Sequence, residues 1–410
     1  MARSKKNTEK VVEQKDVSLA QRKKDLDNFC ESFNKGIGKV VFGRLSENPE
    51  LLKKLIVEYI ETPSRRVNAA LGGGWPRARM SIVSGFPDSG KTLYQLETIA
   101  LNQKKDPNFI GGWIETEHSI TMKDIEMFGI DTERFYFFDT ENKLSGEQIF
   151  DMINSALLTQ KIDMLVVNSI KNLLSQSELD GSISDQQIGA SARMLSKICR
   201  KTLPVIADTN TALIFIQTLS TEIGKLFGNP MQISGGYAIR YNASIIVEHN
   251  NLTIVDKDPI KKDEGRKIGF TVKKNHVCSN ENPYKKEEYF VIYGQGTDRL
   301  VENIEFAEKC GFVLHSGSFY KLPDEDGNPQ IRDGEKMQWQ GLNNFRNYCL
   351  NHPAFVEEME QAINNSNISI ESESLTEDEI KEIESEEKTI NNIIENSDKD
   401  DIIEKASEEE

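Results

Sequence analysis

The residues with the clearest chemical potential form one short loop in the first quarter of the chain. The loop fits the pattern G-x-x-x-x-G-K-[ST], whose backbone N–H groups wrap a triphosphate. Within it, Lys91 is expected to reach the β and γ phosphates, and the Thr92 hydroxyl to hold Mg²⁺. The pattern therefore predicts a nucleotide site. Its eight residues are Gly85, Phe86, Pro87, Asp88, Ser89, Gly90, Lys91 and Thr92.

The segments on either side of this loop supply the context that the chemistry needs. Residues 80–84 form an apolar run typical of a buried strand, and residues 92–100 have the pattern of a helix. The partial positive charge of a helix N-terminus would then face the phosphates. A chance glycine-lysine turn is the alternative, and the strand and helix together disfavour it.

Further apolar runs predict the rest of the core sheet. Residues 110–115, 162–168 and 212–217 are continuous apolar segments typical of parallel strands, with helical patterns between them. Strands that alternate with helices around a phosphate loop predict an open, twisted, mainly parallel α/β sheet with ligand at the strand C-termini. Three later segments alternate more in polarity and are interpreted as antiparallel additions at one edge: residues 243–248, 268–272 and 289–293.

Polar side chains end two of these strands. Glu117 follows the strand at 110–115, where it could orient a water onto the γ-phosphate. Glu115 could do so in another register, and a solvated loop carboxylate is the other interpretation. Asn168 ends the strongest strand, where a phosphate-loop ATPase normally keeps a carboxylate that holds Mg²⁺ through water. An amide accepts a hydrogen bond from such a water but brings no charge, so either Mg²⁺ binds more weakly or another carboxylate helps.

Two long segments follow core strands, at 175–185 and 218–236. Loops of this length inside a compact domain are usually functional or disordered. In the second, Phe227 suits stacking against bases, and the glycine pair Gly235 and Gly236 can offer N–H groups to phosphate. A flexible surface loop with one buried phenylalanine is the alternative.

Basic residues recur near these segments. Arg193, Ser196 and Arg200 share one face of the helix after the first segment and could track a phosphate backbone, although such a face is often merely solvated. Lys274 lies at the end of a later strand, where it could reach a phosphate, including one on a neighbouring subunit. The histidines have no metal-ligand spacing.

The charge of the chain is unevenly distributed. The net charge is −16, but residues 371–410 hold 17 Asp/Glu and 4 Lys, a net of −13, which leaves −3 for the remainder. Residues 1–25 carry 8 Lys/Arg against 4 Asp/Glu. The acidic total therefore does not exclude a polyanionic partner. The hydrophobic fraction of 37% suggests that part of the chain is unfolded.

The cysteines and the apolar runs predict the compartment. Five scattered cysteines without a C-x-x-C pair indicate reduced thiols in the cytosol. We find no signal-peptide core and no apolar run of membrane-spanning length, so a soluble, intracellular protein is expected.

Composition and pattern divide the chain into five parts. We expect a disordered basic arm at 1–17 and a helix with a short strand (39–42) at 18–63, which could dock on a neighbouring subunit. The ATPase core would span 64–298, a small α+β lobe 299–363, and a disordered acidic tail 364–410.

Together these segments resemble the RecA-type recombinases, including the phage UvsX-like branch. The resemblance runs from about Leu19 to Ile363. It implies a RecA-like phosphate-loop ATPase core and an ATP- and Mg²⁺-dependent filament on single-stranded DNA that pairs homologous duplex DNA and exchanges strands. It also implies the cytoplasm of a bacterial or phage-infected cell, with single-strand-binding and loader proteins as possible partners. The motifs in family order are the phosphate loop, residues 115–118, 129–131, 165–170, 178–181, 192–196, 227–230 and 235–236.

The resemblance also implies roles for single residues. Lys91 and Thr92 become the phosphate and Mg²⁺ residues, Glu117 the catalytic glutamate, and Lys274 a lysine that acts on the neighbour's ATP. The N-terminal helix and strand become the piece that docks on the adjacent protomer, and the acidic tail tempers access to duplex DNA. The DNA-binding set is Arg193, Ser196, Arg200, Phe227, Gly235 and Gly236.

Three departures from the family pattern lie around the nucleotide. Asn168 replaces an aspartate, His276 stands where a second trans-acting lysine is common, and Thr218 aligns with the γ-phosphate-sensing glutamine, for which the adjacent Gln217 could serve. We therefore expect DNA binding to be kept, while the hydrolysis rate stays open. A hydrolysis-poor filament protein that coats DNA is one alternative; a RecA-fold motor or regulatory ATPase that forms rings is another.

Overall fold

The computed structural model describes residues 18–140, 144–182, 189–221, 231–233, 237–255, 258–277, 284–366, 373–374 and 381. The expected basic arm and most of the acidic tail lie outside this part. The chain divides into two compact units, Met1–Glu58 and Tyr59–Glu410. Tyr59 and Ile60, grouped above with the N-terminal region, form a strand of the second unit.

The first unit is built on one long amphipathic helix. Helix α1 (Leu19–Ile37) begins at Ser18, whose side chain accepts a hydrogen bond from Gln21 N–H, and ends at Gly38 in the left-handed conformation. Gly36 stays helical near the C-terminal end of α1. Its apolar side chains Leu26, Phe29 and Phe33 are exposed, and the Phe29 and Phe33 rings stack with centroids 5.7 Å apart.

The short strand expected at 39–42 is not formed. Instead, the Asn34 side chain binds this segment: its Oδ1 accepts from Val41 N–H (2.9 Å) and Phe42 N–H (3.2 Å), and its Nδ2 donates to Phe42 O. The backbone groups that a strand would use are therefore occupied by a side chain. A 3₁₀ turn (Leu45–Glu47) and α2 (Pro49–Lys53) complete the unit.

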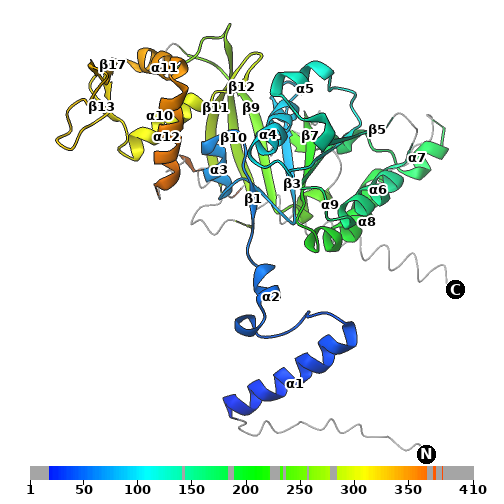
Figure 1. The fold of residues 1–410 in the computed structure, drawn as a ribbon. Coiled ribbons are helices and arrows are strands. Elements are labelled where there is room, and N and C mark those ends of the chain that lie inside the picture. Colours follow the sequence, from blue (N-terminus) through cyan, green and yellow to red (C-terminus); the bar gives the residue numbers. More distant parts are fainter. Residues whose placement is uncertain are drawn as a thin grey trace, which may run out of the picture. The chain divides into compact units, whose positions relative to one another are not determined.

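The second unit is organised around one large mixed sheet (Figure 1). Its strand order is β12-β11-β10-β9-β3-β7-β6-β4-β5, and β8 and β18 pair with β7 and β11. The strands from β5 to β9 in this order are parallel, so their carboxyl ends share one edge. The bounds are β3 (Arg79–Gly85), β4 (Gly111–Glu115), β5 (Phe135–Asp139), β6 (Met164–Asn168), β7 (Ala212–Thr221), β8 (Met231–Ile233), β9 (Ile245–Leu252), β10 (Gly265–Asn275), β11 (Lys285–Ile292), β12 (Gly296–Thr297) and β18 (Glu373–Ser374).

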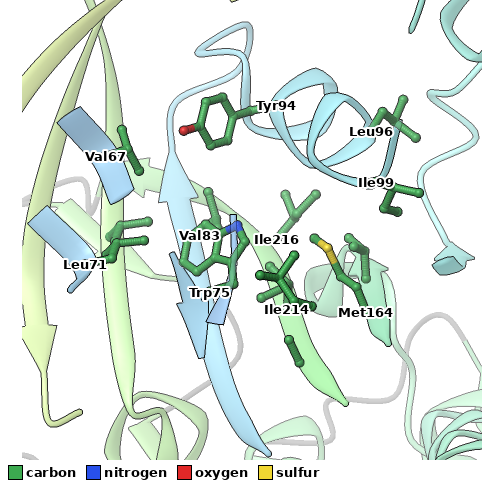
Figure 2. Close-up of a cluster of buried hydrophobic side chains, with 14 of the residues drawn as sticks. Val67, Leu71, Trp75, Val83, Tyr94, Leu96, Ile99, Met164, Ile214 and Ile216 are labelled. Atoms are coloured by element: carbon green, nitrogen blue, oxygen red, sulfur yellow. The ribbon is translucent and has the colours of Figure 1, made fainter. Parts of the chain in front are cut away.

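Helices cover both faces of this sheet and create two apolar cores. On one face, Tyr94, Leu96 and Ile99 of the covering helix belong to the same apolar core as Val83 and Ile216 of the strands (Figure 2). On the other face, the strands pack against three helices through a separate core. The first face is covered by α4 (Lys91–Lys105) and α5 (Met122–Phe128), with α3 (Arg65–Leu71) and the β1–β2 pair (Tyr59–Ile60, Trp75–Pro76) beside it; the second is covered by α6 (Gly146–Leu158), α8 (Ala190–Ala207) and α9 (Tyr237–Asn242).

Several predictions from the sequence need correction. β9 pairs in parallel with β3 and belongs to the main sheet; only β10 and later strands are antiparallel additions. β5 was not predicted. The segment at 175–185 contains helix α7 (Gln176–Asp180), which begins with a capping box formed by Ser175 and Glu178. The segment at 218–236 starts as a hairpin, because β7 continues to Thr221 and pairs with β8.

The predicted C-terminal lobe has its own apolar core, which includes Phe345, Met359 and Val313. It begins with a helix, turns at Gly311 and again at 324–327, and ends in two helices separated at Pro353, which has no N–H to continue the first of the two. The elements are α10 (Arg299–Lys309), β13 (Leu314–Ser316), β14 (Phe319–Lys321), β15 (Ile331–Arg332), β16 (Glu335–Lys336), β17 (Gln338–Gln340), α11 (Leu342–Asn351) and α12 (Pro353–Asn365).

Candidate functional site

The phosphate loop joins β3 to α4, as the sequence predicted. A Cβ on Gly85 would lie 2.4 Å from His249 O, so only glycine fits where β3 ends beside β9. Gly90 has φ +79 and caps the N-terminus of α4, a conformation that favours glycine. The intervening residues 86–89 form the turn, and Asp88 also has a positive φ of 62. These constraints leave the N-terminus of α4 facing the loop.

Lys91 is held inside the loop. Its Nζ donates to Phe86 O (2.6 Å) and Ser89 Oγ (3.3 Å), and the residue is only 6% exposed. Burial lowers the pKa of Lys91 to about 8, while the negative charges of Glu117 and Asp88 oppose this shift. Among the described residues no carboxylate forms an ion pair with this buried ammonium group, which is suited to an anionic ligand.

Glu115 and Asn168 meet at the carboxyl ends of β4 and β6, where they are register partners. Asn168 Nδ2 lies 3.1 Å and 3.3 Å from the two Glu115 carboxylate oxygens and 3.0 Å from Ser119 Oγ. Both residues belong to strand positions that face α4, since Val166 and Trp113, two residues earlier, lie in that core. The sequence had left open whether Glu115 or Glu117 faces the site.

Glu117 lies just beyond this pair. Its carboxylate accepts a hydrogen bond from Ser169 Oγ, and its N–H donates to Glu115 Oε1 at 2.8 Å. Thr116 N–H donates to Asn168 O at 2.6 Å. The ends of β4 and β6 are thus tied together by both backbone and side-chain bonds. Because the charge of Glu117 acts on Lys91, two of the three predicted catalytic residues lie near each other.

The residues at this edge fit a magnesium nucleotide. Thr92 is half-buried in the first turn of α4. Asn168 Oδ1 is buried and has no hydrogen-bond partner among the described residues, so it is available to accept from a metal-bound water. In the described part, no group of three His, Cys, Asp or Glu side chains is placed to hold a metal. Mg²⁺ would supply charge neutralisation of the phosphates.

Gln217 lies on the other face of the sheet. It is the register partner of Ser84, one residue before Gly85, and its side chain follows Phe215 into the core beneath α6 and α8. Both polar atoms of its side chain are buried without a partner among the described residues. Gln217 is therefore adjacent to the loop but separated from Asn168 by the sheet.

Lys274 lies apart from the loop of its own chain. It pairs in register with Ile246, which pairs with Ile82, three residues before Gly85. Its Nζ donates to Tyr241 O at 2.8 Å, at the end of α9, and lies 5.7 Å from the Tyr241 ring centroid. The structure thus does not bring Lys274 to the phosphate loop within one protomer.

The predicted DNA-binding residues are described only in part. Arg193 and Arg200 are exposed on α8, and Ser196 is half-buried between them. The same helix also exposes Lys197 and Lys201, so its outer face is more basic than the predicted set alone. Phe227, Gly235 and Gly236 lie outside the described residues.

An apolar cavity of about 350 Å³ opens beside the loop, toward β10 and β11. The sequence did not predict this cavity, because its walls come from residues between 88 and 297 that share no sequence pattern. Glu97 in its wall accepts three hydrogen bonds from Thr297, and burial raises the pKa of Glu97 to about 7. The walls also include Phe128, Ile268, Tyr289, Val291 and Tyr293.

A further buried titratable group, His249, lies where β9 passes the phosphate loop. His249 packs among the rings of Tyr94, Phe270 and Tyr289, and burial lowers its pKa to about 3. In the described part, no helix is long and apolar enough to cross a membrane.

A strand–phosphate loop–helix unit at the carboxyl edge of a parallel sheet, with a buried lysine and strand-end carboxylates, defines a phosphate-loop nucleotide-binding protein. Comparison with known proteins narrows this class. A family model described as the RecA N-terminal domain matches residues 24–298. "Protein RecA" of Aquifex aeolicus is 31% identical over 348 residues, 84% of this chain and 93% of the relative; that of Bifidobacterium longum is 30% identical over 345 residues, 84% and 80%.

The chain therefore belongs to the RecA family. It is an ATP-dependent recombinase of DNA recombination and repair. Proteins of this family are DNA-dependent ATPases that use ATP with Mg²⁺ and form filaments on DNA.

Proposed function

We propose that this chain hydrolyses ATP at the phosphate loop while forming a filament on single-stranded DNA, and that the filament pairs homologous duplex DNA and exchanges strands. The observation that carries the proposal is that an intact phosphate loop lies at the same edge of the sheet as the hydrogen-bonded ends of β4 and β6. Lys91 and Glu117 face a common region there, at the edge where ligands bind in open α/β sheets.

Each side chain of the site has a role in this proposal. Lys91 binds the β and γ phosphates, and Thr92 with Asn168 holds Mg²⁺ and its water. Glu117, oriented by Ser169, positions the attacking water. The cavity beside the loop takes the base and ribose, because apolar walls with few polar groups suit a flat heterocycle.

Filament formation is supported by two unpaired surfaces. The exposed apolar stripe of α1 requires a partner surface, and a second copy of the chain supplies one. β5 is the terminal strand of the sheet in the described part, and its Tyr136 and Phe137 are exposed, so its edge suits docking of another copy. In such an assembly Lys274 would act on the neighbour's ATP after leaving the α9 carbonyl groups.

DNA binding is assigned to the basic face of α8 together with Phe227, Gly235 and Gly236. Lys and Arg side chains on one face neutralise phosphates whatever the sequence of the DNA. The proposed partners are single-stranded and duplex DNA together with single-strand-binding and loader proteins. The proposal also includes a regulatory acidic tail and a cytoplasmic location.

A hydrolysis-poor filament protein is the second candidate, and Asn168 is the observation that favours it. The phosphate-loop side of β6 ends in a neutral amide rather than a carboxylate. This candidate predicts ATP-dependent coating of DNA without phosphate release.

The test is phosphate release from ATP with and without single-stranded DNA, with Lys91→Ala as the control. We expect strong stimulation by DNA that is absent from the control. ATP-dependent DNA binding without phosphate release would favour the second candidate. Neither hydrolysis nor nucleotide-dependent DNA binding would refute both.

A further inference from the structure

The strand-end pair Glu115 and Asn168 is built as a unit. Glu115 is 2% exposed and Asn168 is fully buried, and the Asn168 amide nitrogen contacts both oxygens of the Glu115 carboxylate. The carboxylate also accepts from Trp113 Nε1 at 3.0 Å and from Glu117 N–H at 2.8 Å. Side-chain and backbone donors from three residues thus converge on one buried carboxylate.

These contacts decide which way the Asn168 amide points. An ionised carboxylate only accepts hydrogen bonds, so the amide must present its NH₂ group to Glu115. Ser119 Oγ lies 3.0 Å from the same nitrogen and accepts its second hydrogen. Oδ1 is thereby left without a partner among the described residues, although it is buried. A buried acceptor of this kind normally has a ligand or an ordered water as its partner.

Electrostatics explains why the two residues differ in charge. An aspartate at position 168 would place a second carboxylate about 3 Å from Glu115 in a buried site, where like charges repel strongly. One carboxylate and one amide keep a single negative charge and a continuous hydrogen-bond network. The negative charge therefore lies at the end of β4, and the end of the adjacent strand β6 carries the neutral amide.

We propose that Glu115 and Asn168 form an exchanged carboxylate–amide pair, in which Glu115 is a positioning residue that supplies the negative charge missing from β6 and fixes Asn168 Oδ1 as the acceptor for a magnesium-bound water. This inference rests on the proposed ATP site. It argues against the second candidate function, because weak Mg²⁺ binding is no longer expected when Glu115 supplies the charge.

The test uses the full chain and two readouts: the Mg²⁺ concentration that gives half-maximal binding of a fluorescent ATP analogue, and the thermal unfolding midpoint without nucleotide. Glu115→Gln lets the amide of Asn168 rotate, and we expect the Mg²⁺ midpoint to rise about tenfold, while binding in EDTA is unchanged. Asn168→Asp should lower the unfolding midpoint by several degrees. The double variant Glu115→Gln/Asn168→Asp restores one charge and one amide, so both readouts should return to near wild-type values.

Glu302→Gln is the matched control, because Glu302 is also a buried carboxylate but lies at α10, bonded to Ser64 and Arg65. It should not change the Mg²⁺ midpoint. A Glu115→Gln midpoint equal to that of the control, or a double variant no better than the poorer single one, would overturn the inference. If Glu115→Gln does not fold, the inference is tested by comparing both readouts between Asn168→Asp and the double variant. Failure of the proposed function is distinct: the wild type would bind the analogue no better than Lys91→Ala.

Discussion

The two sides of the phosphate loop differ in polarity. Toward β6 and β4 the surroundings are polar, and Glu115, Thr116, Glu117, Asn168 and Ser169 are bonded to one another. Toward β10 and β11 the loop borders an apolar cavity with aromatic walls and one half-buried carboxylate, Glu97. The parallel half of the sheet gathers strand ends at one edge, whereas the antiparallel half presents strand faces.

This difference assigns the two halves of a nucleotide to the two sides. Charged phosphates and water activation need fixed dipoles and charges, which the bonded strand ends provide. A base and ribose gain from apolar contact and need few directed bonds. Substitutions on the polar side should therefore act on the rate of the chemical step, and those on the apolar side on affinity.

The largest expected effect is that of Glu117→Gln. It removes the group proposed to position water while keeping size and hydrogen bonding, so kcat for ATP should fall about 10²-fold or more. Binding of the fluorescent ATP analogue should stay within about twofold. Glu126→Gln, an exposed glutamate on α5, is the control. An unchanged kcat would contradict the role of Glu117.

On the apolar side, Tyr293→Ala should raise the KM for ATP about tenfold with little change in kcat, since it removes a ring from the cavity wall. Tyr293→Phe keeps the ring and loses only the hydroxyl, which accepts from Arg266 Nε at 3.3 Å. It should behave like the wild type in steady-state kinetics. A fall in kcat for Tyr293→Ala would erase the distinction between the two sides.

The basic face of α8 lies on the opposite face of the sheet from α4. Substitutions there should change DNA binding without changing either side of the nucleotide site. Arg193→Ala should weaken binding of single-stranded DNA a few-fold, about equally for all sequences, and reduce the slope of log affinity against log salt by about 1. Hydrolysis without DNA should not change. Fluorescence anisotropy at several salt concentrations measures this, and an unaltered salt slope would remove Arg193 from the DNA surface.

The smallest effect concerns Glu97. Its folded pKa of about 7 is raised above that of the unfolded chain, so the stability contributed by its neutral form is full below about pH 4.5 and is lost as pH rises through 7. Glu97→Gln should therefore raise the unfolding midpoint by a few degrees at about pH 8 and converge with the wild type in acid. Melting curves that differ equally at every pH would show that burial of Glu97 is not the cause.

The sequence predicted what depends on local pattern and missed what depends on distant pairing. The phosphate loop is defined by eight neighbouring residues, and its strand and helix followed from periodicity. The pairing of Glu115 with Asn168 joins positions 53 residues apart and depends on the register of β4 and β6. β5 was missed because Phe135–Asp139 is short and lacks alternation, and β9 was assigned the wrong direction because strand polarity is a property of the sheet.

The most direct test of the division between the two sides is competition by inorganic triphosphate against the fluorescent ATP analogue in Tyr293→Ala. Triphosphate has no nucleoside, so its affinity should equal that of the wild type, while the affinity for ATP falls about tenfold. An equal loss of affinity for triphosphate and for ATP would contradict the account, because the apolar wall would then act on the phosphates as well.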